Sequence, residues 1–456
     1  WENLAVLALV FGRPAVAISD AREALKHLPD DAGMRAIADN ADLLNTIAGD
    51  VRFRPLAATI AGDPAHRDVG VRALRLVVDA SKNGRSTGAV ARDLAALANE
   101  YPAYLPLQNL SAALLSDVRQ FELAAEIASR TMDMFPSDGT SARLATIALA
   151  ETGDWRRAIS VSQAWARRSP SQRPLADVYL SAAQRNLGRV DDALQTLQPH
   201  LAAALAEPGR FLPLLGEYAT ALVQRGRVNE AWAVLEPNLS QGASWRELTM
   251  RLAGSLLPNA SSASRWFDAA ESAIPADASQ ERVYLAQSVF YAGDRLQAPE
   301  LIDRARTYID QATDHPGATA GTWFLRGRIA DQTGDLATAE ESYRQALGLS
   351  PEFTLAKNNL AMTLVARGRN LDEAVDLARA ASASIPEDPN LLDTLARVLS
   401  RAGRHDEALE TIELAIQRDR QNLAWISTKA DLLEAAGRAD EGQRLRQRYG
   451  LVVGSN

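Results

Sequence analysis

The chain has 456 residues and a formal net charge of −8, and 47% of its residues are hydrophobic although only 6% are aromatic. This composition is typical of closely packed helices rather than of one large aromatic core, and the scattered Lys and Arg residues argue against nucleic acid as a partner. Because the chain has no cysteine, disulfides, thiolate metal ligands and thiol catalysis are excluded.

The N-terminal residues carry a spacing that recurs further along the chain. Trp1, Gly12, Ala17, Ala24 and Pro29 stand at the same intervals as a second set of residues near the C-terminus. We therefore expect the chain to begin inside a truncated repeat. Any targeting signal would then lie upstream of Trp1, which leaves both the bacterial cytoplasm and the periplasm open as its location.

The following unit, 35–68, is degenerate, and regular units come after it. Gly49 and Asp50 predict a turn, but Pro55 and the segment 61–64 are expected to interrupt the next helix. Closing prolines then recur every 34 residues, at Pro102, Pro136 and Pro170. The turn sequence also recurs, as GDWRRA at 153–158, GRVDDA at 188–193 and GRVNEA at 226–231. These intervals predict successive pairs of short antiparallel helices.

Regularity is lost in the middle of the chain. The segment 259–264, NASSAS, is the most loop-like stretch of the sequence, although apolar residues around it favour a distorted unit over a flexible linker. Gly293 and Ala298 are predicted to form the next turn, and an extended second helix or loop is expected at 309–316. An irregular middle of this kind predicts a change of curvature.

The clearest unit is 323–351, in which each recurring residue has a mechanical role. Gly327 and Ala339 are small, so that two helices can approach closely. Gly334 tolerates a left-handed turn, Asp335 can accept hydrogen bonds from the start of the second helix, and Pro351 ends that helix. The full set is Trp323, Gly327, Gly334, Ala339, Tyr343, Ala346 and Pro351. These residues predict one helix–turn–helix unit.

This pattern resembles the tetratricopeptide repeat (TPR), a 34-residue unit with Trp, Leu-Gly, Tyr, Ala and Pro at fixed places. The resemblance implies an all-α, right-handed superhelical solenoid of about thirteen repeats, several of them degenerate. Bacterial multi-repeat TPR proteins are the relatives that we expect, because Ala and Arg are abundant. Repeats of this family act by binding other proteins, so the resemblance implies a binding scaffold.

Later copies complete the array. Gly368, Gly403 and Gly437 each begin a further turn, Asn370 is a one-residue insertion, and Gly442 stands where Ala is expected. Arg438, Arg444, Arg446 and Arg448 are expected as a polar surface on a capping helix. We thus predict an N-terminal array at 1–245, irregular units at 246–318, a regular array at 319–449 and a tail at 450–456.

The candidate binding residues follow from the register of the repeats. If the array coils as the resemblance implies, residues one, five and eight after each Trp323-type position face a concave groove. Their mixture of aromatic, amide and charged side chains suits a partner peptide or helix. We predict contacts at Phe290, Tyr291, Phe324, Arg328, Asp331, Asn358, Met362, Asp393, Arg397 and Asp431.

No group of residues predicts catalysis or a cofactor. The five histidines are dispersed, no HExxH or acidic calcium loop is present, and the Gly-rich turns lack phosphate-binding spacing. We therefore expect a non-enzymatic scaffold without metal, cofactor or membrane insertion, whose partner is a protein or peptide. The alternative is a recruiting or assembly arm of a larger bacterial enzyme, or of an exopolysaccharide or envelope secretion protein. A further hypothesis is self-association through the N-terminal repeat, where Trp1, Leu4 and Leu7 would be near solvent.

Overall fold

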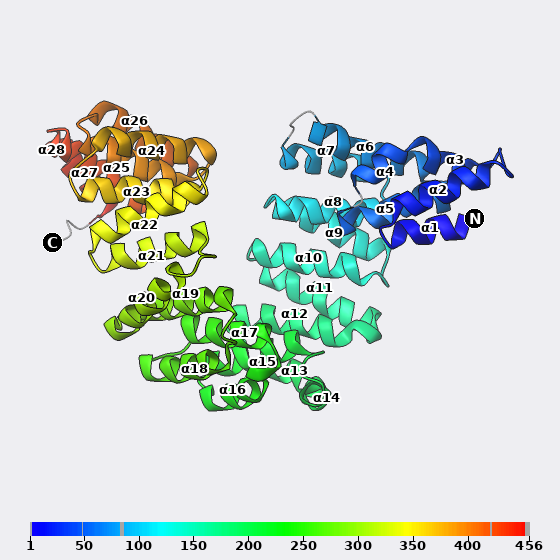
Figure 1. Ribbon diagram of the computed structural model, residues 1–456, viewed down its shortest axis with the longest axis horizontal. Helices are drawn as coiled ribbons and strands as arrows, with labels where there is room; N and C mark the ends of the chain where they lie inside the picture. Colours follow the sequence, from blue (N-terminus) through cyan, green and yellow to red (C-terminus); the bar gives the residue numbers. More distant parts are fainter. Residues whose placement is uncertain (1, 48, 83–85, 420–421, 452–456) are drawn as a thin grey trace. The chain divides into compact units, whose positions relative to one another are not determined.

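The computed structural model describes residues 2–47, 49–82, 86–419 and 422–451, which form helices and short connections without a β-strand (Figure 1). The all-α solenoid expected from the sequence is confirmed. The chain divides into two compact units, unit 1 (Trp1–Val234) and unit 2 (Leu235–Asn456). Trp1 and most of the predicted tail, 452–456, lie outside the described residues. The domain boundaries drawn from the sequence stay a prediction.

Unit 1 is built from helices that pack against their neighbours along the chain. From α8 to α13, the even-numbered helices are the first helices of their pairs. In order the elements are α1 (Glu2–Val10), α2 (Pro14–Leu25), α3 (Ala32–Asp39), α4 (Ala41–Thr46), η1 (Val51–Phe53), α5 (Arg54–Gly62), α6 (Arg67–Lys82), α7 (Thr87–Glu100), α8 (Leu105–Asp117), α9 (Phe121–Met134), α10 (Gly139–Glu151), α11 (Trp155–Arg168), η2 (Pro170–Gln172), α12 (Arg173–Asn186), α13 (Val190–Leu197), η3 (Gln198–His200), α14 (Leu201–Ala206), α15 (Leu212–Gln224) and α16 (Val228–Leu235).

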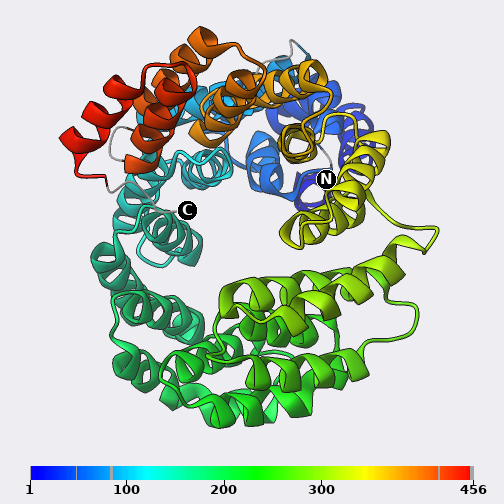
Figure 2. The ribbon, with the colours of Figure 1, turned by 90° about the vertical axis from the view of Figure 1, so that its left-hand side faces the viewer.

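Unit 2 continues the pairing, and Figure 2 shows its helices from a second direction. They are η4 (Glu236–Gln241), α17 (Ala243–Ser255), α18 (Ala260–Ala273), α19 (Ser279–Leu296), α20 (Pro299–Thr313), α21 (Ala320–Gln332), α22 (Leu336–Leu349), α23 (Thr354–Ala366), α24 (Leu371–Ser384), α25 (Pro389–Arg401), α26 (His405–Arg418), α27 (Leu423–Ala435) and α28 (Ala439–Tyr449). The odd-numbered helices from α19 to α27 are the first helices of their pairs.

The turn between α21 and α22 shows why these sequences form helix pairs. Gly334 has a φ of +77°, a left-handed conformation that favours glycine. The Asp335 N–H donates to the Ala330 carbonyl at 2.9 Å, and the Asp335 carboxylate accepts from the Thr338 N–H at 3.1 Å. The turn therefore provides hydrogen-bond partners for a backbone carbonyl at the end of α21 and for a backbone N–H at the start of α22, as predicted.

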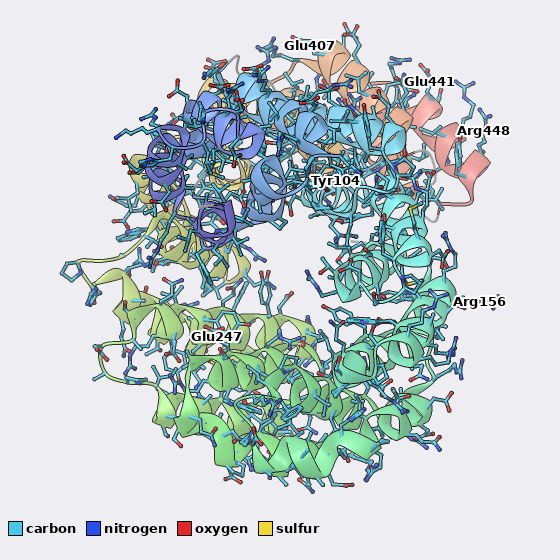
Figure 3. The ribbon with its side chains drawn as sticks, turned by 90° about the vertical axis from the view of Figure 1, so that its right-hand side faces the viewer. Tyr104, Arg156, Glu247, Glu407, Glu441 and Arg448 are labelled. Carbon is cyan, nitrogen blue, oxygen red and sulfur yellow. The ribbon has the colours of Figure 1, made fainter. Side chains whose placement is uncertain are left out.

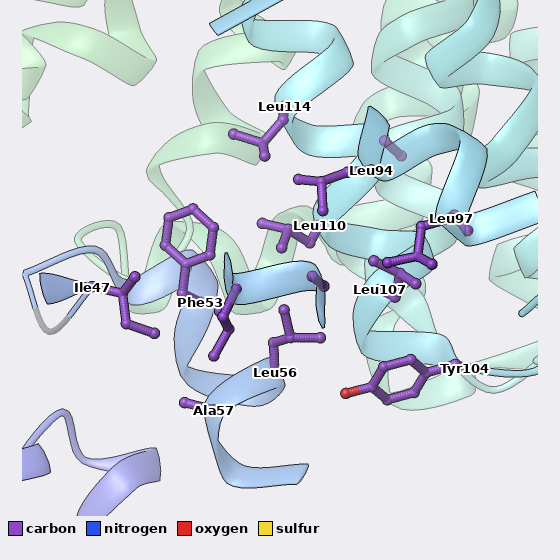
Figure 4. Close-up of a cluster of buried hydrophobic side chains, with 14 of the residues drawn as sticks. Ile47, Phe53, Leu56, Ala57, Leu94, Leu97, Tyr104, Leu107, Leu110 and Leu114 are labelled. Atoms are coloured by element: carbon purple, nitrogen blue, oxygen red, sulfur yellow. The ribbon is translucent and has the colours of Figure 1, made fainter. Parts of the chain in front are cut away.

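The N-terminal part of unit 1 departs from simple pairing. Helix α5 packs against α1, α3 and α6. Phe53, just before α5, and Leu56, within α5, are buried. They lie with Leu107, Leu110 and Leu114 of α8 in one apolar cluster (Figure 4). The segment 53–57 is thus part of the core of unit 1 and lies close to α8.

Pro55 does not interrupt a helix as the sequence suggested. It stands in the first turn of α5, where a missing N–H costs little because that group has no helical partner. Nearby, the Tyr104 hydroxyl donates to Thr59 Oγ1 at 2.6 Å, and His66 stacks on the Tyr104 ring with centroids 4.7 Å apart. Burial raises the pKa of Tyr104 to about 12. These contacts anchor α5 and α6 to the start of α8.

Two features of the middle of the chain differ from what their residues suggest in the sequence. The segment 259–264 is not a loop, because Asn259 caps α18 by accepting from the Ser262 N–H at 2.9 Å. Gly293 is not the turn residue: it lies within α19, and Gln297 takes the left-handed conformation with a φ of 51°. A Cβ at position 293 would lie 2.8 Å from Ile302 Cγ1, so this glycine permits close packing of α19 against α20.

The capping helix α28 also differs from expectation. Arg446 is not a surface residue, since it is 8% exposed and pairs with Asp431 and Glu434 of α27. Gly442 replaces the usual alanine because a Cβ there would lie 2.7 Å from the Ala430 carbonyl oxygen. The last helix is therefore attached by close backbone packing and by a buried guanidinium.

Candidate functional site

The residues predicted to bind a partner lie on the first helices of the pairs in unit 2, which are α19, α21, α23, α25 and α27. We call the surface of these helices that carries the predicted residues the first-helix face of unit 2. Arg328 makes the most contacts with other predicted residues on this face. The Arg328 guanidinium stands 5.3 Å from the Phe290 ring centroid and 5.5 Å from that of Tyr291. Its Nη1 donates to the Tyr291 hydroxyl oxygen at 3.1 Å. Hydrogen bonds from Gln287 and Arg328 lower the pKa of Tyr291 despite its partial burial. Helices α19 and α21 thus hold a cation over two aromatic rings.

Arg328 has no carboxylate partner among the described residues. Phe290 is 2% exposed and forms the floor of the cluster, whereas Tyr291 is 42% exposed. A ligand carboxylate can therefore reach a guanidinium whose orientation is already set by rings. We call Phe290, Tyr291 and Arg328 the Arg328 cluster.

The Phe324 side chain is packed between helices and is not part of an open surface. Its half-buried ring lies between Tyr343, with centroids 5.8 Å apart, and Phe353, with centroids 4.9 Å apart. The side chain also packs against the core of unit 2. Its ring is therefore held by neighbouring helices before any partner arrives.

Asp331 is likewise engaged within the chain. Its carboxylate accepts from the Tyr343 hydroxyl at 2.7 Å and from Thr363 Oγ1 at 3.1 Å. Burial raises the pKa of Asp331, although these two hydrogen bonds act in the opposite direction. Burial, followed by the adjacent Asp331 charge, raises the pKa of Tyr343 in turn. Asp331 thus links α21, α22 and α23.

The remaining predicted residues form smaller groups. Met362 packs against the core, and Asn358 Nδ2 donates to Asn359 Oδ1 at 3.2 Å. Arg397 donates through Nε to Asp393 at 2.8 Å and through Nη2 to Thr428 Oγ1 at 2.6 Å. Asp431 is the residue that pairs with Arg446 of the capping helix. The structure therefore brings Phe290, Tyr291 and Arg328 together, while Asp393 and Arg397 form a separate pair.

Two cavities of unit 1 were not anticipated from the sequence. One, of about 320 Å³, lies between the starts of α12 and α15 and is lined by Leu175, Val178 and Phe211 among others. The other, of about 380 Å³, lies between α8 and α10 and includes Asn109 and Arg143. Asn109 and Arg143 precede Pro136 and Pro170 by the same interval that separates Phe324 from Pro351. The repeat register thus pointed to them, but it was applied only to the C-terminal copies.

Among the described residues, no group of three or more His, Asp or Glu side chains is arranged to hold a metal ion. In the same part of the chain, no helix combines the length and apolar character needed to cross a membrane.

Comparison with known proteins gives a family match in unit 2. The family model described as tetratricopeptide repeat matches residues 264–450. Protein O-mannosyl-transferase TMTC1 of Homo sapiens is 28% identical over 204 residues, 44% of this chain and 22% of that protein. A TPR repeat-containing protein of Pseudomonas aeruginosa is 30% identical over 95 residues, 21% of this chain and 16% of that protein.

A third relative is cellulose synthase operon protein C of Pseudomonas fluorescens, which is 33% identical over 149 residues, 30% of this chain and 12% of that protein. The chain therefore matches less than a quarter of the length of each of these curated relatives.

Among solved structures, a thermophilic TPR protein of Thermus thermophilus is 20% identical with a TM-score of 0.31, covering 36% of this chain and 89% of that one. YrrB, titled a TPR protein with an unusual peptide-binding site, is 19% identical with a TM-score of 0.30, covering 37% of this chain and 81% of that one. The family match and the helix pairs with their turn glycines show that residues 264–450 consist of tetratricopeptide repeats.

Proposed function

We propose that the first-helix face of unit 2 binds an acidic segment of a partner protein, as an extended peptide or a helix. The tetratricopeptide repeats matched at residues 264–450 imply a protein–protein interaction scaffold, which supports this proposal. The observation that carries the finer proposal is the Arg328 cluster, in which a guanidinium without a carboxylate partner among the described residues is held on Phe290 and Tyr291.

The chemistry of this cluster sets what it would recognise. A carboxylate can form two parallel hydrogen bonds with a guanidinium, and aromatic faces favour apolar side chains beside it. Because the rings already orient Arg328, little side-chain entropy is lost on binding. Asp393 and Arg397, on a later first helix of the same unit, are paired with each other, so the recognition of a carboxylate rests on Arg328. The partner segment should therefore combine an acidic residue with apolar neighbours.

A capture experiment tests this proposal. The chain and its Arg328→Ala variant are immobilised, and the proteins that they retain from the native cell extract are quantified by mass spectrometry. We expect at least one partner to be retained about tenfold less by the variant, the size expected for losing a charged hydrogen bond. Arg306→Ala on α20, which removes a half-exposed arginine from a second helix, is the matched control. Equal retention by all three proteins would contradict the proposal.

A second candidate function rests on the similarity to cellulose synthase operon protein C. In this reading the chain is an assembly arm of a larger enzyme or of an envelope secretion protein, and its helix faces recruit other components of that machinery. Deletion of the gene should then lower the exopolysaccharide that the cells release, and the full-length gene should restore it. An unchanged amount of polysaccharide in the deletion strain would dismiss this candidate.

A further inference from the structure

The cavity of about 380 Å³ in unit 1 lies between α8 and α10, which are the first helices of their pairs. Leu105, Pro106 and Asn109 of α8 form one side, and Arg143 and Leu144 of α10 form the other. Pro55 and the neighbouring Arg52 complete the wall. The volume of about 380 Å³ falls within the range of pockets that hold small ligands or single large side chains. Most of this lining is apolar.

The charged groups of the cavity differ in whether they have partners. Arg52 Nη2 pairs with Asp50 Oδ2 at 2.6 Å, and Arg52 also pairs with Asp117 at the end of α8. Asp138 caps α10, since its carboxylate accepts from the Ser141 N–H at 2.8 Å and from Asn109 Nδ2 at 3.0 Å. These groups are already satisfied within the chain.

Arg143 is the exception. Its side chain is half-buried, and within the described part of the chain it forms neither a hydrogen bond nor an ion pair. A partly desolvated guanidinium without an acceptor is unfavourable, and an anion brought into the cavity would remove that cost. The cavity therefore presents one unsatisfied positive group beside an apolar surface.

We propose that this cavity is a second binding site, which takes a partner peptide carrying a carboxylate side chain next to an apolar residue. The carboxylate pairs with Arg143, and the apolar side chain lies against Leu105, Pro106 and Leu144. The charge complementarity is specific to Arg143, because Arg52 and Asp138 are occupied. This site is separate from the Arg328 cluster and does not depend on it.

The test uses the full chain and two labelled peptides with blocked ends. The first has one glutamate between two leucines, and the second has glutamine in place of the glutamate. Fluorescence anisotropy should show the glutamate peptide binding about tenfold more tightly, and this difference should shrink at high salt. Arg143→Met should remove the difference between the peptides.

Control variants separate this site from general charge effects. Arg156→Met removes an exposed arginine on α11, labelled in Figure 3, and should leave peptide binding unchanged. Arg143→Glu should reject the glutamate peptide and prefer a lysine counterpart. Circular dichroism of each variant should match that of the parent chain, since Arg143 makes no hydrogen bond or ion pair with the rest of the described chain.

The peptide-binding test distinguishes the cavity of unit 1 from the Arg328 cluster of unit 2. Loss of the glutamate preference in Arg143→Met but not in Arg328→Met would support the second site. Loss only in Arg328→Met would assign the peptide to unit 2 and overturn this inference. Equal binding of both peptides, or no binding to the parent chain, would overturn it as well.

Discussion

The first-helix faces of the two units are built on the same repeat but filled differently. In unit 2, the ring of Phe324 occupies the position next to the Trp323-type residue and packs on Phe353. In unit 1, the equivalent positions hold Asn109 and Arg143, and a cavity of about 380 Å³ remains between them. The repeat therefore determines the position of each side chain on this surface, whereas the size of the side chain decides whether a cavity remains beside it.

The largest expected effect on stability comes from removing the ring of Tyr343, which packs against Phe324. Tyr343 is fully buried, so Tyr343→Ala should lower the free energy of unfolding of the surrounding repeats by about 3–5 kcal/mol. Amide hydrogen exchange of α21 and α22 should report this loss directly, because repeat arrays do not unfold as one two-state body. Tyr343→Phe keeps the ring and should have a much smaller effect. Equal exchange in the two variants would show that the ring does not hold this face together.

The next effect concerns a charged contact that joins successive repeats of unit 2. The Glu340 carboxylate accepts from Arg367 at 2.6 Å and from Arg369 at 2.7 Å, and its side chain is 8% exposed. Glu340→Ala should cost about 2 kcal/mol, below the range for a fully buried pair because the arginines remain partly solvated. Amide hydrogen exchange of α22 and α23 measures this cost. Glu341→Ala, which removes a mostly exposed carboxylate one residue along, is the control, and an equal cost in both would contradict the assignment.

Filling the open face of unit 1 should change binding more than stability. Ala113 lines the cavity, so Ala113→Leu would place a branched apolar side chain in it and narrow it. We expect stability to change by less than about 1 kcal/mol, because the added side chain enters existing space rather than a packed core. The glutamate peptide should bind about tenfold more weakly, which anisotropy measures. Unchanged peptide binding would place the peptide outside the cavity.

The smallest effect is a difference in pH dependence between two carboxylates of one repeat. Burial raises the pKa of Asp331, so its ionisation costs stability as the pH rises through that raised value. Asp331→Asn should therefore be more stable than the parent at pH 7, and this gain should shrink as the pH falls through the raised value and be gone below about 4, the ordinary aspartate value. Unfolding measured over this pH range tests the sign.

Asp335 provides the opposite case. Hydrogen bonds from Thr338 lower the pKa of this exposed capping carboxylate, so its stabilisation is present at neutral pH and is lost as the pH falls through the lowered value. Asp335→Asn should thus be less stable than the parent at pH 7. If both variants shifted stability in the same direction, burial of Asp331 would not be the controlling factor.

Much of the fold was predictable from particular residues. Gly334, Gly368 and Gly403 all have positive φ at the predicted turns, because a left-handed residue is a local requirement that glycine meets with little strain. These successes depend on short-range geometry.

The failures have a common cause. Gly293 was interpreted as a turn residue, yet it provides close contact with Ile302 in the next helix. Arg446 was interpreted as a surface residue, yet it is buried against α27. A glycine can form a turn or permit close helix packing, and an arginine can be exposed or form a buried ion pair. In both cases the role depends on the contacts with the neighbouring helix.

The amino-acid sequence therefore specified the repeat, its turns and the alternation of helices, because each depends on residues within one 34-residue period. The partners of polar side chains depended on the three-dimensional packing. Arg397 finds Thr428 thirty-one residues away, Arg328 finds Tyr291 thirty-seven residues away, and Arg143 finds no partner in the described chain. Such pairings need helices from different repeats to meet at hydrogen-bond distance, which no local pattern encodes.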